Sequence, residues 1–188
     1  MVYQAWLFEE NYVYDIDQVQ GYPLPTLLRL AILVLNQPPY RPLDVLLSYC
    51  HLSLQNSTLT AYAPHFIERA RVGQLLTASP LSMGLLTSKP PAWHPAPSEL
   101  HKVVRDCRAQ CPLDLSNVAI GFSIRHAGVT HYNMPLVLGM STPREVHECI
   151  KVWREINEGH GADREKYEEL IRRKFEDAGF KDWSWASP

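Results

Sequence analysis

The sequence predicts an α/β fold built on a parallel sheet, and three features indicate it. Strand-like and helix-like segments alternate along most of the chain, as they do where helices connect parallel strands. The predicted strand 44–51 contains the apolar run Val45-Leu46-Leu47, which is typical of a strand covered on both faces. The segments 78–86 and 139–142 each follow a short apolar strand and precede a helix, which is the pattern of a β/α barrel.

Four segments are predicted to be strands, because each is short, largely apolar and bounded by turn-forming residues. They are residues 13–20, 44–51, 74–78 and 136–140. Pro23 stops the first from continuing, and Ser79-Pro80 ends the third. With the helices between them they make four βα units, whose crossovers should be right-handed.

The predicted helices begin at residues that favour helix starts. They are residues 24–36, 56–71, 98–110 and 117–126, a helix opening at 142–145, and the charged segment 160–178. Pro25 and Pro143 fall in first turns, where a missing N–H costs little. Asn56 or Ser57, Ser98 and Thr142 are the expected caps. Pro64 should bend or split the helix that contains it.

Length and composition narrow the possible classes. A chain of 188 residues suits one domain, whereas a complete β/α barrel usually needs about 250. The formal net charge of −2 and the pI near 6.4 argue against nucleic acid or an anionic membrane as the main partner. The start is too acidic for a signal peptide, and no stretch reaches the ~18 apolar residues of a membrane span. The four scattered cysteines predict reduced thiols in a cytoplasmic protein.

Three regions follow from these patterns. Residues 1–20 form a divergent N-terminal segment, which we expect to be irregular as far as residue 12. Residues 21–156 carry the βα units. Residues 157–188 form a charged helix and a tail containing Trp183 and Trp185, which is predicted to dock onto the rest of the chain.

Four motifs carry a resemblance to a known family. They are Ser48-Tyr49-Cys50-His51, the run from Ala78 to Leu86, Pro90-Pro91-Ala92-Trp93-His94-Pro95 and Gly139-Met140-Ser141-Thr142. Together they resemble aldo-keto reductases of the L-galactose dehydrogenase and D-arabinose 1-dehydrogenase type. The resemblance covers 21–156 and corresponds to the C-terminal half of that family, so it implies half of a TIM (β/α)8 barrel, from strand five to strand eight.

The resemblance also implies a dinucleotide cradle. In the family, the loop after strand seven wraps the pyrophosphate, and the loop and helix after strand eight hold the adenosine. The implied cofactor-binding residues here are Ser79, Leu81, Gly84, Gly139, Met140, Ser141 and Glu148. A helix beginning at Pro143 should offer free N–H groups to a phosphate. Glu145 stands where relatives that prefer NADP often have Arg, so a retained site should favour NAD.

The resemblance also implies a loss. The family's catalytic Asp, Tyr, Lys and His lie on its first four strands, so none has a counterpart in this sequence. The Ser that holds the nicotinamide amide corresponds to Gln20, and the Asn of the last binding helix corresponds to Cys149. We therefore expect a truncated protein without the redox tetrad, which requires no cofactor and retains at most residual NAD(P) binding.

Chemistry in a barrel collects at the carboxyl ends of the strands. His51 is the best general acid–base candidate at this rim, because its unperturbed pKa lies near neutrality. Tyr49 lies two residues earlier and should share its face of the strand, so it is the second candidate catalytic residue. The candidate substrate-binding residues are Tyr22, Cys50, Met83, Trp93 and His94. The histidines and cysteines show no metal-ligand spacing.

Three functions fit these features. The first is a non-redox enzyme, such as an isomerase, cyclase or dehydratase, that acts on a small carbonyl-bearing metabolite by acid–base catalysis. The second is a subunit of an NAD-dependent sugar or aldehyde dehydrogenase that completes its site with a partner. The third is an interaction protein without catalytic activity. Binding of NAD would distinguish the second from the others.

Half a barrel predicts association as well. Four parallel strands leave two unpaired edges and an open concave face, and such features promote association. A homodimer that pairs the last strand of one copy with the first strand of the other, at 13–20, would restore eight parallel strands. The alternative is that the N-terminal segment folds over the open face of a monomer.

Overall fold

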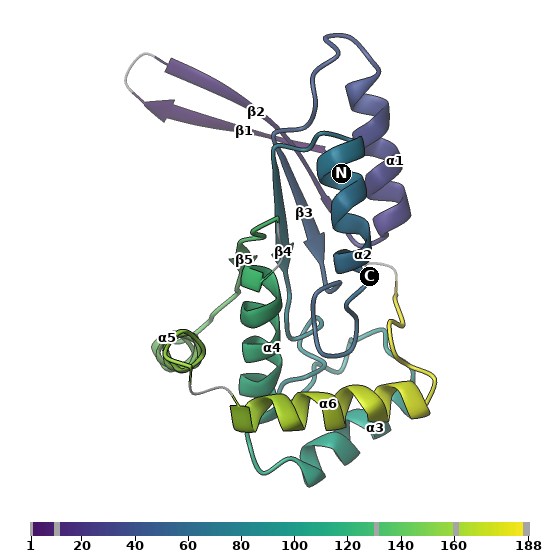
Figure 1. The fold of residues 1–188 in the computed structure, drawn as a ribbon, viewed down its shortest axis with the longest axis vertical. Coiled ribbons are helices and arrows are strands. Elements are labelled where there is room, and N and C mark those ends of the chain that lie inside the picture. Colours follow the sequence, from purple (N-terminus) through teal and green to yellow (C-terminus); the bar gives the residue numbers. More distant parts are fainter. Residues whose placement is uncertain (1, 10–11, 130–131, 160–161, 186–188) are drawn as a thin grey trace.

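The computed structural model describes residues 2–9, 12–129, 132–159 and 162–185. One five-stranded sheet runs through the molecule in the order β1-β2-β3-β4-β5 (Figure 1). The strands are β1 (Val2–Glu9), β2 (Tyr12–Gly21), β3 (Val45–Tyr49), β4 (Gln74–Ala78) and β5 (Leu136–Val137). Strands β2 to β5 are all parallel, which confirms the predicted α/β fold with four parallel βα units.

The helices follow the strands in the predicted order. They are α1 (Leu24–Leu35), α2 (Leu59–Pro64), the π-helical turn η1 (His65–Arg69), α3 (Ser98–Gln110), α4 (Leu115–Val129), α5 (Pro143–Asn157) and α6 (Ala162–Asp177). In Figure 1, α1 and α2 are drawn to the right of β3, α4 and α5 to its lower left, and α3 and α6 below the carboxyl ends of the strands. Ala127 of α4 is buried in the same cluster as residues of α1, α2 and η1.

Pro64 splits the second predicted helix, as expected. It ends α2, and the chain continues as η1, in which the Ala70 N–H donates to the His65 carbonyl five residues back. Two of the expected caps are wrong. Ser98 is the first residue of α3, and its hydroxyl donates to Glu99 instead of capping the helix. Thr58 holds the N-cap position of α2, and Asn56 accepts hydrogen bonds from its N–H and its hydroxyl.

The N-terminal segment differs from the prediction. Residues 2–9 are not irregular: they form β1, which pairs antiparallel with β2 from Val2↔Val19 to Glu9↔Tyr12. The outer edge of β2 is therefore occupied, and it does not offer the free first-strand edge that the predicted dimer used. Only Gln18–Gly21 of β2 pair with β3, so the first part of β2 extends beyond the parallel sheet. That part pairs with β1 instead and forms a hairpin.

The last strand is shorter than predicted. The prediction extended to Met140, but β5 contains only Leu136 and Val137, which pair with Thr77 and Ala78. Strand β4 ends at Ala78, so the residues after Val137 have no neighbouring strand with which to pair. By contrast, β4 has the predicted bounds.

One face of the sheet is packed and the other is open. Leu46, Ser48, Leu75 and Thr77 are fully buried, and the residues between them along β3 and β4 are only half-buried. Successive residues of a strand point to opposite faces, so this alternation assigns the buried residues to the face covered by α1, α2 and η1. The prediction that both faces are covered is therefore wrong in this structure.

A second core lies beyond the carboxyl ends of the strands. It joins α3, α4 and α6 through buried residues such as Leu100, Val118 and Phe175. Leu54 and Leu86, from the loops after β3 and β4, are buried in the same cluster. Both loops are therefore packed into the second core beside the strand ends.

Candidate functional site

His51 does not share a face with Tyr49. The residue between them, Cys50, has φ +65°, so the alternation of the strand ends there. The His51 ring is 4% exposed, and its Nδ1 lies 3.1 Å from the Ser48 hydroxyl oxygen, on the packed face of the sheet. Tyr49 lies on the open face. Ser48 is therefore the side chain that orients the His51 ring, while the Tyr49 hydroxyl bonds to Gln20.

Burial also changes the proton affinity of His51. Loss of hydration disfavours the charged ring and lowers its pKa from 6.5 to about 4, although the Tyr49 backbone and Asp182 favour the charged form. The ring is therefore neutral at physiological pH. His51 was the best general acid–base candidate because its unperturbed pKa lies near neutrality, and burial removes that basis for the prediction.

Tyr49 belongs to a small polar cluster on the open face. Its hydroxyl donates to Gln20 Oε1 at 2.7 Å, and its ring stacks on Tyr22 with centroids 5.3 Å apart. Burial is the main cause that raises the pKa of Tyr22. These three half-buried side chains come from the ends of β2 and β3, where the sequence predicted chemistry. Gln20, expected as a departure from the family, is thus the partner of Tyr49.

Cys50 is held as a thiol. It is 5% exposed, and burial raises its pKa to about 12 despite hydrogen bonds with the Ser79 side chain and the Met83 N–H. A thiolate is the reactive form of cysteine, so this group is not an activated nucleophile. Its contacts do connect the end of β3 to the loop after β4.

The loop after β4 is tightly wound. Ser79, Ser82, Met83 and Gly84 all have φ between +50° and +88°. A side chain at Gly84 would meet Pro91 Cδ at 3.1 Å in addition to adopting a positive φ. The N–H groups of Ser82 and Gly84 donate to carbonyls within the loop, as do those of Leu85, Leu86 and Thr87. The loop is therefore preformed, and Ser79 and Leu81 remain half-exposed on it.

His94 has a structural environment. Its Nδ1 accepts from the Ala96 N–H at 3.1 Å, so its Nε2 carries the proton and donates to the Ser82 carbonyl at 2.9 Å. Burial is the main cause that lowers the pKa of His94. Trp93 is 62% exposed beside it, and the Trp185 ring lies against His94 at 4.9 Å. The predicted substrate-binding pair therefore consists of one buried ring and one exposed ring.

The C-terminal tail docks at this rim, as predicted. Trp183, Ser184 and Trp185 close over Tyr22, Cys50, His51 and Asn56, and the space between the two groups is too small for a water molecule. The Trp185 indole N–H donates to the Met83 sulfur at 2.9 Å. The sequence placed Tyr22, Cys50 and His51 at one rim correctly, but it did not place the tail above them.

A side chain of α5 itself, that of Glu145, occupies N–H groups at the start of this helix. Thr142 and Glu145 form a capping box, and the Glu145 carboxylate accepts from the N–H groups of Ser141 and Thr142 at 2.6 and 3.2 Å. The expectation of free N–H groups at this helix start is therefore wrong. Glu145 is exposed, so a ligand can still approach its carboxylate, and Glu148 lies half-buried one turn along the helix.

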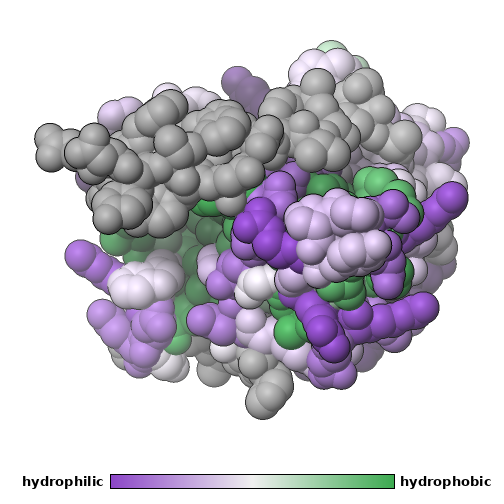
Figure 2. Space-filling model, turned by 90° about the horizontal axis from the view of Figure 1, so that it is seen from above, coloured by the Kyte–Doolittle hydropathy of each residue, from purple (hydrophilic) through white to green (hydrophobic). Residues whose placement is uncertain are grey.

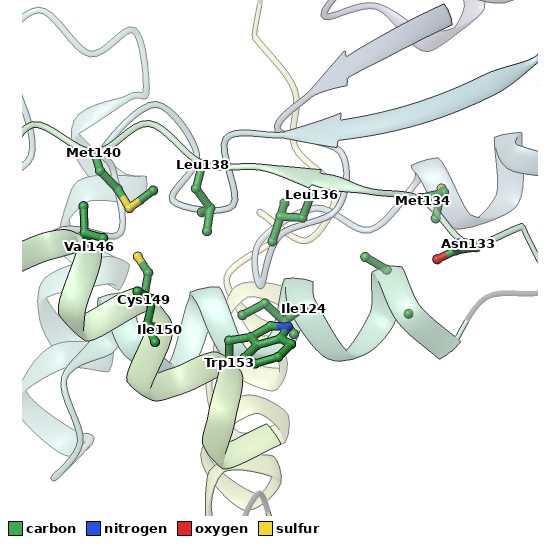
Figure 3. Close-up of a pocket in the computed structure, with 12 residues that line it drawn as sticks. Ile124, Asn133, Met134, Leu136, Leu138, Met140, Val146, Cys149, Ile150 and Trp153 are labelled. Carbon is green, nitrogen blue, oxygen red and sulfur yellow. The ribbon is translucent and has the colours of Figure 1, made fainter. Parts of the chain in front are cut away.

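An apolar groove lies apart from this rim, between α4, β5 and α5. Its volume is about 360 Å³, and its walls include Leu136, Met140, Cys149 and Trp153. Figure 3 shows the Met140 side chain, on the segment after β5, pointing toward Cys149 on α5. Figure 2 shows hydrophobic residues in a recess on the side where α5 lies in Figure 1. Met140, predicted to bind a cofactor, therefore lines the groove, and Gly139 before it is exposed.

Two general features of the described residues complete the site. Over residues 2–9, 12–129, 132–159 and 162–185, no cluster of three His, Cys, Asp or Glu side chains could hold a metal ion. In the same part of the chain, every helix is too short or too polar to cross a membrane.

Comparison with curated proteins finds two dehydrogenases to which the chain is similar. It is 34% identical over 141 residues to L-galactose dehydrogenase of Arabidopsis thaliana, an alignment that covers 73% of this chain and 42% of that protein. It is 28% identical over 181 residues to D-arabinose 1-dehydrogenase of Saccharomyces cerevisiae, covering 90% of this chain and 52% of the relative. The chain thus spans about half the length of the curated relatives it matches. No protein-family model matches the sequence.

Proposed function

Because the chain is a homologue of aldo-keto reductases of the L-galactose and D-arabinose dehydrogenase type, we propose that it forms the dinucleotide-binding half of an NAD-dependent sugar or aldehyde dehydrogenase. The observation that carries this proposal is the open sheet. Four parallel strands are packed by helices on one face only, in a chain that aligns with about half of each relative. A second polypeptide segment of the kind that supplies the rest of those relatives would cover the other face.

The residues at the strand ends fit NAD better than NADP. Glu145 already supplies a negative charge at the start of α5, where it would repel the additional phosphate of NADP. The same carboxylate can accept a hydrogen bond from the free ribose hydroxyl of NAD. Ser79 and Leu81 would hold the pyrophosphate on the loop that the positive φ of Gly84 shapes, and Ser141 and Glu148 would flank the adenosine. NAD would supply the hydride acceptor when bound.

The catalytic acid would come from the second segment. That segment could be a separate subunit or further sequence of the same protein; a second copy of this chain would lack the acid too, and β1 already occupies the β2 edge that the predicted dimer used. Within the described residues, β5 pairs only with β4, so its outer edge is available to a new strand. The unit as a whole would act in the cytoplasm, where the four cysteines would remain free thiols.

A non-redox enzyme is the second candidate, and the cluster of Gln20, Tyr22 and Tyr49 favours it. Two stacked phenols with an amide at the strand ends could bind and polarise a small carbonyl compound without a dinucleotide. In this function Tyr49 would donate the proton, while His51 would hold the end of β3 through Ser48. Replacement of Tyr49 by Phe should then abolish turnover of an identified substrate, and unchanged turnover would exclude this role.

Calorimetric titration with NAD and NADP tests the first proposal. We expect measurable binding of NAD and weaker binding of NADP. The Glu145→Gln variant should narrow the difference between the two, since it removes the repulsive charge. Glu169→Gln, at an exposed position on α6, is the matched control and should leave both affinities unchanged. Absence of binding by either dinucleotide, or equal binding by both in the unmodified protein, would contradict the proposal.

A further inference from the structure

We propose that the apolar groove between α4, β5 and α5 is the docking site for an amphipathic helix of a partner protein that carries acidic residues on one flank. The groove has a volume of about 360 Å³ (Figure 3). Three of its lining side chains, those of Met140, Ile150 and Trp153, are between 42% and 54% exposed. Exposed apolar side chains that gather in one recess are typical of an interaction site.

Helix α5 supplies a continuous apolar stripe to one wall of the groove. Val146, Cys149, Ile150 and Trp153 follow one another at spacings of three and four residues, which places them on one side of the helix. From the first to the last, the stripe extends about 10 Å along the helix axis. A docking helix can match this stripe with side chains at the same spacing.

Helix α4 forms the opposite wall with small residues. Ala127 and Gly128 line the groove, and a Cβ added at Gly128 would meet no atom within 4 Å. Small side chains shorten the distance at which two helices can pack. Since a cavity of about 150 Å³ holds one benzene-sized group, the groove has room for about two apolar side chains from the docking helix.

The flank of α5 beside the groove is positively charged. His147, Lys151 and Arg154 each follow a groove residue by one position, and all three are exposed. Neither Lys151 nor Arg154 forms an ion pair with another residue that the structure describes. Glu155, by contrast, is already paired with Arg164. On a chain of net charge −2, an unpaired basic flank of this kind complements an acidic partner.

The shape of the groove favours a helix over a strand or a membrane. Strand β5 ends at Val137, so no strand edge among the described residues runs along the groove for an extended segment to pair with. A membrane surface would touch the rim but would leave the recess beneath it unfilled. A rod with apolar side chains on one face fills the recess and brings its flank against Lys151 and Arg154.

Two designed peptides test the proposal. Both have about 15 residues, the length at which isolated helices become stable, and both carry leucines at the spacing of the α5 stripe. One peptide has glutamates on its flanks, and the other has lysines at the same positions. In fluorescence anisotropy with labelled peptides, the acidic peptide should bind about tenfold or more tightly than the basic one.

Variants locate the binding in the groove. Gly128→Leu fills the empty space without a clash in the fold, so it should weaken binding of the acidic peptide about tenfold or more. Lys151→Glu should reduce the preference for the acidic peptide. Lys102→Glu makes the same change of charge at an exposed position on α3, and it is the matched control that should leave the preference unchanged.

The outcomes separate this site from the proposed function. Equal binding of both peptides, no binding at millimolar peptide, or no effect of Gly128→Leu would overturn the docking site. Binding to phosphatidylserine vesicles without binding to the acidic peptide would also overturn it. Gly128 and Lys151 lie outside the proposed cofactor cradle, and NAD is absent from the assay. Peptide binding without NAD binding would therefore retain the docking site and reject the proposed function, and the reverse result would do the opposite.

Discussion

Replacement of Gln55 by Ala should release the C-terminal tail. The Gln55 amide donates two hydrogen bonds to tail carbonyls, at 2.7 and 2.9 Å, from a side chain that is 1% exposed. A buried hydrogen bond contributes about 1 kcal/mol, so the loss should be about 2 kcal/mol. Urea unfolding monitored by circular dichroism measures this change. Hydrogen exchange at Asp182, whose N–H donates to the Gln55 carbonyl, reports the local release.

Gln74→Ala is the matched control for this variant. Gln74 Nε2 also donates to two carbonyls, those of Leu75 and Asn133, but at 3.1 and 3.3 Å and in a partly exposed position. Water can replace such bonds, so this loss should be below about 0.5 kcal/mol. The reasoning is refuted if Gln55→Ala costs no more than Gln74→Ala, or if exchange at Asp182 does not accelerate.

Three further changes have defined outcomes. Thr142→Ala should lower the free energy of unfolding by about 1 kcal/mol through loss of the α5 cap, whereas Thr142→Ser should match the unmodified protein in urea denaturation. Gly84→Ala should cost about 1 kcal/mol or more in the same assay, because φ is +88° and the added Cβ would lie 3.1 Å from Pro91; an unchanged midpoint would rule out this strain. Since the folded protein lowers the pKa of His51 to about 4, the unfolded chain binds more protons below pH 6.5, and stability should fall from pH 6.5 toward pH 4. His51→Asn should reduce that slope in unfolding curves at pH 7 and 5, and an identical slope would contradict the lowered pKa.

The order of the βα units and the bounds of several of their elements could be predicted from the sequence. Strand β4 and helix α3 have the predicted bounds, because Ser79-Pro80 and the proline before Ser98 are strong local signals. Pro64 divides its helix for an equally local reason. The hairpin of β1 and β2 was missed, because pairing at residues 2–9 depends on a neighbouring strand more than on the segment's own pattern.

The site was predictable as a region but not in its geometry. Parallel strands bring Tyr22, Tyr49 and His51 to one end of the sheet, which the order of elements predicts. The positive φ of Cys50 ends the alternation of side chains along the strand, and a cysteine gives no signal for that conformation. The pairing of Glu145 with N–H groups at its own helix start was readable as a Thr-x-x-Glu capping box, but it was assigned only to cofactor preference.

The most direct test of a dinucleotide-binding half is an NMR titration of the 21.5 kDa chain with NAD, followed at backbone amides. We predict chemical-shift changes concentrated in the loop 79–85 and at 139–148. Changes confined to the apolar groove at Ile124, Ile150 and Trp153, or no changes at millimolar NAD, would contradict the account.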